Sequence, residues 1–112
     1  MSLSTHVLDT SIGRPVRGMP VFVDRRDGER DWQHLRAAET DPDGRIPKLL
    51  PAGSLSAGVY RLTFATGDWA ESVGTTSFYP EVTIVVEITS PEEHHHVPLL
   101  LSPYGYTTYR GS

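Results

Sequence analysis

Histidines are the residues of this sequence whose positions first suggest chemistry. His6 lies near the start of the chain, and His94, His95 and His96 form a run near its end. An imidazole titrates near neutral pH, so it can act as a general base or acid under physiological conditions. Successive side chains of a strand point to opposite faces, so His94 and His96 would share one face and His95 the other. The sequence therefore predicts two imidazoles on one side of a strand.

Zinc binding is an alternative role for the pair formed by His94 and His96. A structural zinc site normally needs four protein ligands, and a catalytic one needs three. The chain has no cysteine and only two other histidines, His6 and His34. A metal site would therefore require His6 or a carboxylate to join the pair. The spacing leaves this alternative open without favouring it.

Two further features could bind a polar substrate. Arg45 follows the turn sequence Asp-Pro-Asp-Gly at residues 41–44. Its planar guanidinium suits paired hydrogen bonds to oxygen-rich groups, although an arginine here could equally be a solvated residue of a loop or strand start. The chain ends with Tyr109, Arg110, Gly111 and Ser112, and residues 106–109 are strong strand formers. Chain ends usually fray, but an ordered strand would place these residues at a defined site.

The elements that must position these residues are short strands. Nine prolines and ten glycines interrupt the sequence at short intervals. Apolar and polar residues alternate in residues 19–25, 59–66 and 81–89, and more weakly in residues 32–38. Residues 66–74 are predicted to form one short helix, in which Asp68 and Glu71 have capping-box spacing and Gly74 ends the helix. Seven or eight strands in a single domain, residues 1–112, predict an all-β protein with a two-sheet antiparallel β-sandwich.

Of the two strands that carry the histidines, the second is apolar on both faces towards its end. Residues 4–9 place Ser4, His6 and Leu8 on one side. Residues 95–101 place three apolar side chains on one face, and the other face carries His94, His96, Pro98 and Leu100. A strand that is apolar on both sides is usually covered on both sides. In a domain of this size, the second cover could be a partner subunit.

Composition excludes several classes of function. The formal net charge is −4 and charges of both signs are scattered, so we expect no nucleic-acid partner. No stretch approaches the roughly 20 apolar residues of a membrane span, so we expect no membrane partner. The N-terminal residues lack the pattern of a signal peptide, so we expect a cytoplasmic protein. Without cysteine, neither disulfides nor thiol catalysis is available.

Two segments resemble the transthyretin-like proteins. The sequence His6-Val7-Leu8-Asp9, followed by Gly13 and Pro15, resembles their opening motif, and residues 99–104, Leu-Leu-Leu-Ser-Pro-Tyr, resemble the motif of their next-to-last strand. The resemblance covers essentially the whole chain. Two mild departures are His95, where the family often has tyrosine, and Thr107, where it often has serine.

Within that family, the chain is similar to the 5-hydroxyisourate hydrolases. His6 stands where the hormone carrier transthyretin has lysine, and His96 stands where the carrier has threonine. Arg45 matches the arginine of the hydrolases. The end of the chain resembles their terminal tetrapeptide, with Tyr109, Arg110, Gly111 and Ser112.

This resemblance implies a transthyretin fold with two four-stranded sheets, assembled as a homotetramer, a dimer of dimers with a channel between the dimers. It also implies ring-opening hydrolysis of 5-hydroxyisourate in urate degradation, by cleavage of a C–N bond to 2-oxo-4-hydroxy-4-carboxy-5-ureidoimidazoline. His6 and His96 would activate water, and Arg45 would stabilise the oxyanion. His6 and Arg45 would also bind the substrate, together with Tyr109, Arg110, Gly111 and Ser112. No metal and no cofactor would be needed. The alternative within this family is a carrier of small ligands without catalysis.

Overall fold

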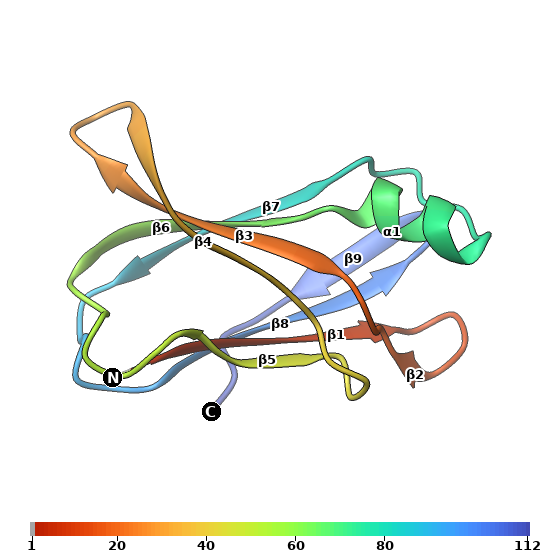
Figure 1. Ribbon diagram of the computed structural model, residues 1–112, viewed down its shortest axis with the longest axis horizontal. Coiled ribbons are helices and arrows are strands. Elements are labelled where there is room, and N and C mark those ends of the chain that lie inside the picture. The colour runs from red at the N-terminus through yellow and green to blue at the C-terminus, as the bar shows by residue number, and fades with distance from the viewer. Residues whose placement is uncertain (1) are drawn as a thin grey trace.

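Two β-sheets pack face to face in the computed structural model, which describes residues 2–112 (Figure 1). In chain order the strands are β1 (Leu3–Asp9), β2 (Arg14–Pro15), β3 (Pro20–Asp27), β4 (Asp31–Glu39), β5 (Arg45–Leu50), β6 (Gly58–Phe64), β7 (Val82–Ile88), β8 (His95–Ser102) and β9 (Gly105–Thr108). One helix, α1 (Thr66–Val73), lies between β6 and β7 and closes one end of the sandwich. The predicted all-β sandwich with one short helix is confirmed.

The sheet that holds the histidine strands differs in two ways from the expectation. Its order is β2-β1-β8-β9, and β5 also pairs with β1, which makes five strands instead of four. In addition, β1 and β8 are parallel, so this sheet is mixed, whereas the other strand pairs of residues 2–112 are antiparallel as predicted. Parallel neighbours need a long crossover, and here nearly the whole chain separates the two strands. The second sheet has four antiparallel strands in the order β4-β3-β6-β7.

The core lies between the two sheets and follows the predicted alternation. From the second sheet it receives Val21, Val23, Tyr60, Leu62, Phe64, Val82, Ile84 and Ile88, and from the first Leu3, Val7, Val97, Leu99 and Leu101. Burying each large apolar side chain contributes about 1.5–3 kcal/mol. The alternate positions of β1 and β8 are thereby left on the outer face of the first sheet, where the predicted site residues lie.

The helix ends as expected but does not begin as expected. Gly74 terminates it with a φ of 73°, a left-handed conformation that favours glycine. The N-cap residue is Ala65, without a side-chain cap, so the predicted capping box of Asp68 and Glu71 is wrong. The helix follows β6 after a single residue, Ala65. Two hydrogen bonds hold this junction: the Ala65 N–H donates to the Pro20 carbonyl, and the Thr66 hydroxyl donates to the Tyr79 carbonyl. Within residues 2–112 no helix is long and apolar enough to cross a membrane.

Candidate active site

Three adjacent strands bring the candidate residues together on the outer face of the first sheet. In the parallel pair of β1 and β8, Ser4 lies opposite His96 and His6 lies opposite Pro98. On the other side of β1, His6 lies opposite Arg45, the first residue of β5. Residues about ninety positions apart in the sequence therefore become neighbours through strand pairing.

The turn before β5 holds Arg45 at this position. One carboxylate oxygen of Asp41 accepts hydrogen bonds from the N–H groups of Asp43 and Arg45, each at 2.9 Å. Gly44 has a φ of 75°, and a side chain there would collide with the Val7 carbonyl oxygen of β1. The Gly44 carbonyl in turn accepts the Val7 N–H at 2.7 Å. Only glycine allows the turn to pack this closely, and Arg45 starts its strand beside His6 as a result.

A pocket of about 350 Å³ lies on this face. Its lining consists of Ser4, Thr5, Arg45, Pro47, His94, His96 and Ser112. The structure thus brings together three of the predicted site residues, Arg45, His96 and Ser112. His6 pairs with Arg45 next to the pocket but does not line it.

The His96 ring is held by a hydrogen bond at one of its two nitrogens. Its Nδ1 lies 2.7 Å from the Ser4 hydroxyl, and its Nε2 makes no hydrogen bond to any residue from 2 to 112. Burial lowers the pKa of His96 below its ordinary value, and the positive potentials of His6, His94 and Arg45 lower it further. At neutral pH the ring is therefore uncharged. It can accept a proton.

The tautomer of neutral His6 follows from its hydrogen bond. Its Nε2 lies 2.9 Å from the backbone carbonyl of Asp43, which can only accept. Nε2 must therefore carry the proton, and Nδ1 keeps the lone pair. The same turn that positions Arg45 consequently orients the neighbouring imidazole.

The last two residues of the chain are fixed against His96. The Gly111 N–H donates to the His96 carbonyl at 2.8 Å, as an isolated bridge beyond the end of β9. A Cβ on Gly111 would lie 2.5 Å from Cδ2 of the His96 ring, so glycine is needed where the segment crosses the imidazole. Ser112 follows and lines the pocket.

Tyr109 and Arg110 do not reach this pocket within one chain. Both line a cavity of about 250 Å³ between β7, β8 and β9, which shares only His96 with the pocket beside Arg45. The guanidinium of Arg110 lies 3.5 Å from the carboxylate of Glu93, and both side chains are largely exposed. The predicted terminal tetrapeptide is therefore split: Tyr109 and Arg110 line one cavity and Ser112 lines the other.

His95 points to the opposite side of β8, as the alternation predicts. His95 is 8% exposed, and its Nδ1 lies 3.1 Å from the Glu93 carbonyl oxygen. His94, on the pocket side, lies with its Nε2 3.0 Å from the Ser4 hydroxyl. Among residues 2–112 there is no group of three or more histidine, cysteine or acidic side chains arranged to hold a metal ion.

Ser4 lines the pocket and lies within hydrogen-bond distance of both His94 and His96, a contact that the sequence did not predict. It was placed on the same strand face as His6, but it was not considered as a functional group. The detectable signal was its position two residues before a candidate histidine, because residues i and i+2 of a strand share a face.

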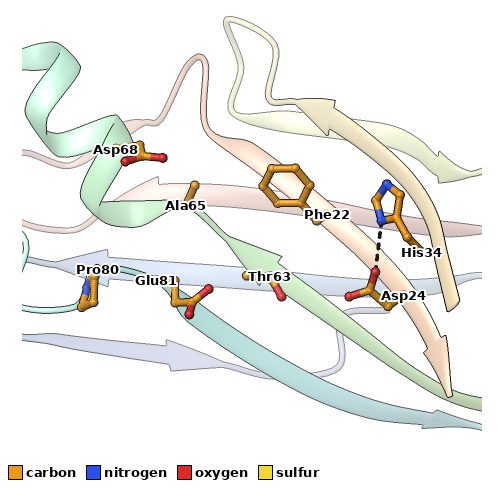
Figure 2. Close-up of a pocket in the computed structure, with 8 residues that line it drawn as sticks. All are labelled: Phe22, Asp24, His34, Thr63, Ala65, Asp68, Pro80 and Glu81. Carbon is orange, nitrogen blue, oxygen red and sulfur yellow. Dashed lines mark hydrogen bonds and ion pairs between the residues drawn. The ribbon is translucent and has the colours of Figure 1, made fainter. Parts of the chain in front are cut away.

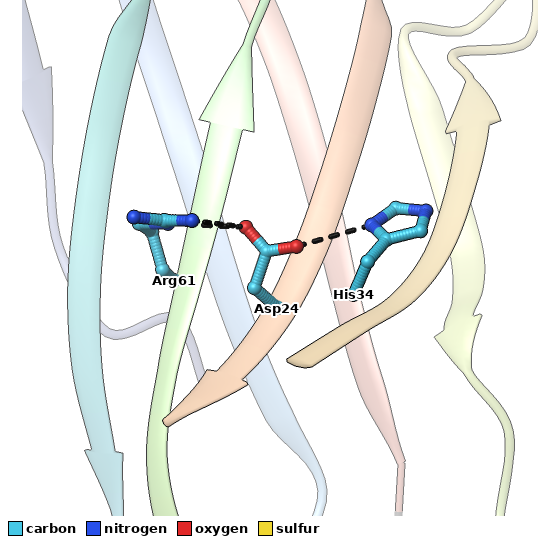
Figure 3. Close-up of polar contacts among 3 residues, drawn as sticks. All are labelled: Asp24, His34 and Arg61. Carbon is cyan, nitrogen blue, oxygen red and sulfur yellow. Dashed lines mark hydrogen bonds and ion pairs between the residues drawn. The ribbon is translucent and has the colours of Figure 1, made fainter. Parts of the chain in front are cut away.

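A third cavity, of about 420 Å³, lies on the outer face of the other sheet (Figure 2). There Asp24 bonds His34 at 3.0 Å and Arg61 at 2.9 and 3.0 Å (Figure 3). The Arg61 guanidinium also lies over the Trp32 ring. The Asp24 carboxylate holds β3 to its two neighbouring strands. The cavity also contains Asp68 and Glu81, so it offers mainly acceptors to a ligand. The pocket beside Arg45 instead offers a guanidinium and the imidazoles of His94 and His96.

Known proteins resemble this chain in sequence and in fold over nearly its whole length. Residues 3–111 match the model of the HIUase/Transthyretin family. A 5-hydroxyisourate hydrolase of Mus musculus is 45% identical over 111 residues, which cover 98% of this chain and 94% of the relative. The solved structure of the Klebsiella pneumoniae 5-hydroxyisourate hydrolase has a TM-score of 0.85 at 40% identity, covering 99% of this chain and 93% of the other.

The hormone-binding branch has the same fold at lower sequence identity. Sea bream transthyretin, solved in complex with thyroxine, superimposes with a TM-score of 0.92 at 28% identity, covering 99% of this chain and 95% of the other. Fold similarity alone therefore does not separate an enzyme from a carrier. Both kinds of relative nevertheless share one fold and one family model, and the match extends over nearly every residue: this chain belongs to the HIUase/Transthyretin family.

Proposed function

We propose that this protein hydrolyses 5-hydroxyisourate, opening its six-membered ring at a C–N bond, in the degradation of urate. The observation that carries the proposal is the pairing of a cation, Arg45, with an uncharged imidazole, His96, in one pocket. Hydrolysis of a cyclic amide requires a base for water and positive charge for the oxyanion. The names of the relatives at 40–45% identity support the same reaction.

The proposed base is His96, assisted by His6. The Nε2 of His96 has no partner among the described residues, so a water molecule placed there would meet a lone pair when Nδ1 carries the proton. His6 lies next to Arg45, and its Nδ1 also keeps a lone pair. Either ring can hold or accept a proton of the attacking water.

Arg45 is the proposed electrophile. When water adds to the ring carbonyl, negative charge develops on the carbonyl oxygen, and a nearby guanidinium stabilises that charge by about 3–4 kcal/mol in favourable sites. The backbone of Arg45 is held by Asp41, while its side chain is exposed toward the pocket opening. Ser112 and Gly111 would close the pocket on the side of His96.

We also propose a homotetramer, as the family resemblance implies. β7 and β9 form the same edge of both sheets, and neither has an outer strand neighbour within the described chain. An open pair of edges is a ready surface for strand pairing. A partner would also cover Tyr109, which is 56% exposed. Sedimentation that shows a stable 12.4 kDa monomer at micromolar concentration would contradict this assembly.

The competing function is passive binding of a small ligand in the channel. A carrier does not need two imidazoles and a guanidinium around one pocket, which argues for the enzyme. The experiment that separates them is to generate 5-hydroxyisourate from urate in the cuvette, add the protein and follow the decay of its absorbance. Thyroxine binding without acceleration of the decay would favour the carrier.

The variants His96→Asn and His6→Asn test the assignment of the base. Each should lower the rate by about 100-fold or more, the scale for losing a general base. His95→Asn is the matched control, because it lies on the opposite face of the same strand. If that control is the inactive variant while the other two retain activity, the proposed site is wrong.

A further inference from the structure

A chain of alternating serines and histidines leads from the pocket to the surface. The Ser4 hydroxyl lies between His96 Nδ1, at 2.7 Å, and His94 Nε2, at 3.0 Å. The Ser2 hydroxyl lies 2.5 Å from the other nitrogen of His94, Nδ1. His94 is exposed, whereas Ser4 is only 5% exposed. Both nitrogens of His94 and the inner nitrogen of His96 therefore belong to one hydrogen-bonded row.

The parallel register of β1 and β8 creates this row. Ser4 lies opposite His96, and Leu3 lies opposite His95, so the small side chain of Ser4 falls between the two rings on its face. The rings of His94 and His96 are nearly parallel, with an interplanar angle of 18° and centroids 6.5 Å apart. That spacing is too wide for direct contact between the two rings and admits one hydroxyl.

A hydroxyl has one proton, so Ser4 can donate to only one of the two nitrogens and must accept from the other. In the first arrangement, Ser4 donates to His94 and accepts Nδ1–H of His96. The Nε2 of His96 then has a lone pair and is a base. In the second, Ser4 donates to His96 Nδ1 and accepts Nε2–H of His94. The Nε2 of His96 then carries a proton and is an acid.

We propose that Ser4 is a positioning residue for the hydrolysis proposed above, and that it switches His96 from base to acid by passing a proton to His94. The inference rests on the proposed function. When His96 Nε2 takes a proton from water, its Nδ1 proton moves to the Ser4 oxygen, and the Ser4 proton moves to His94 Nε2. The Nδ1 proton of His94 then leaves toward Ser2 and solvent. Only N–H and O–H bonds change: His96 and His94 each gain a proton on Nε2 and lose one from Nδ1, Ser4 exchanges its proton, and one proton leaves for each one taken up.

The electrostatics of the pocket explain why such a path is useful. Burial disfavours the charged form of His96 most, and the neighbouring His6, His94 and Arg45 disfavour it further. An imidazolium formed beside Arg45 would be costly while that guanidinium serves the oxyanion. Removal of the proton through Ser4 leaves His96 neutral but protonated at Nε2. It can then protonate the leaving ring nitrogen. A proton from solvent returns to His94 Nδ1, the Nε2 proton of His94 passes to Ser4, and the Ser4 proton passes to His96 Nδ1, which restores the first arrangement.

The test compares Ser4→Ala with Ser4→Thr, which retains the hydroxyl. Ser102→Ala is the matched control, since Ser102 lies on β8 and its hydroxyl donates to the Gly105 carbonyl. Ser4→Ala should lower kcat by about 10- to 100-fold, the scale for losing a partner that orients a reacting group, with little change in KM. Ser4→Thr should recover most of the rate, and Ser102→Ala should retain it.

A readout independent of activity is the ¹⁵N NMR spectrum of the histidine rings. In Ser4→Ala the His96 Nδ1 and Nε2 signals should move, because the ring loses its partner, whereas Ser102→Ala should leave them in place. An unchanged kcat in folded Ser4→Ala would overturn the proposal, and so would a lower kcat with unmoved His96 signals. A wild-type protein that does not accelerate 5-hydroxyisourate decay would overturn the proposed function instead. Unmoved signals would then still reject the role of Ser4 in orienting His96.

Discussion

The crossing of Gly111 over the His96 ring makes Gly111→Ala an informative substitution. The added Cβ would lie 2.5 Å from Cδ2 of His96, about 0.9 Å inside the 3.4 Å at which ordinary van der Waals contact begins. It would also lie 3.2 Å from Cγ and 3.3 Å from Cβ of the same residue. The contact therefore runs along the base of the ring, and a small rotation of the ring cannot relieve it.

Two movements could remove this clash, and each disturbs the pocket. If the His96 ring moves, it leaves the Ser4 hydroxyl at 2.7 Å. If the terminal segment lifts, the hydrogen bond from the Gly111 N–H to the His96 carbonyl is lost and Ser112 leaves the pocket. One such hydrogen bond contributes about 1 kcal/mol to stability. Misplacing a reacting group by about 1 Å can lower a rate by roughly 100-fold. We therefore expect a large loss of kcat with a small loss of stability.

The assay is the decay of 5-hydroxyisourate, measured beside thermal unfolding of the same preparation. Gly105→Ala is the matched control, because its Cβ would meet only the Ser102 oxygen at 3.5 Å, an ordinary contact. That control should keep both activity and melting temperature. A fully active Gly111→Ala protein would refute the conclusion that the terminal segment must contact His96.

Three further outcomes are expected. Arg45→Lys should lower kcat/KM by about tenfold or more while unfolding changes by less than about 0.5 kcal/mol, because lysine keeps the charge but not the planar donors; equal activity would remove Arg45 from the site. The rate should fall on the acidic side with a midpoint below the ordinary histidine value of about 6.5, because the pKa of His96 is lowered and protonation removes the base; a midpoint above that value in a pH–rate profile would contradict this. Asp24→Asn should destabilise the fold by about 1–2 kcal/mol in urea unfolding, because Arg61 loses its carboxylate, yet it should leave the rate per folded molecule unchanged; a slow but stable variant would point to the second sheet instead.

The alternation of apolar and polar residues was sufficient to predict which side of each strand faces the core. Val97 and Leu99 point inward and His96 points outward, as expected. Such a pattern is readable in one segment, because the pleat of a strand sends successive side chains to opposite faces whatever the strand pairs with. The end of the helix at Gly74 was readable for a similar local reason, since a left-handed residue there favours glycine.

Strand pairing was not readable from local patterns. The parallel alignment of β1 with β8 and the strand β5 beside it depend on hydrogen bonds between distant segments. Their register decides that Ser4 stands between two imidazoles and that Arg45 meets His6. It also places Ser112 in the pocket and leaves Tyr109 outside it. The sequence by itself determined the residue types of the site and the faces they occupy. Only the tertiary structure decided which of them meet, because a contact across ninety residues follows from the registers of whole strands.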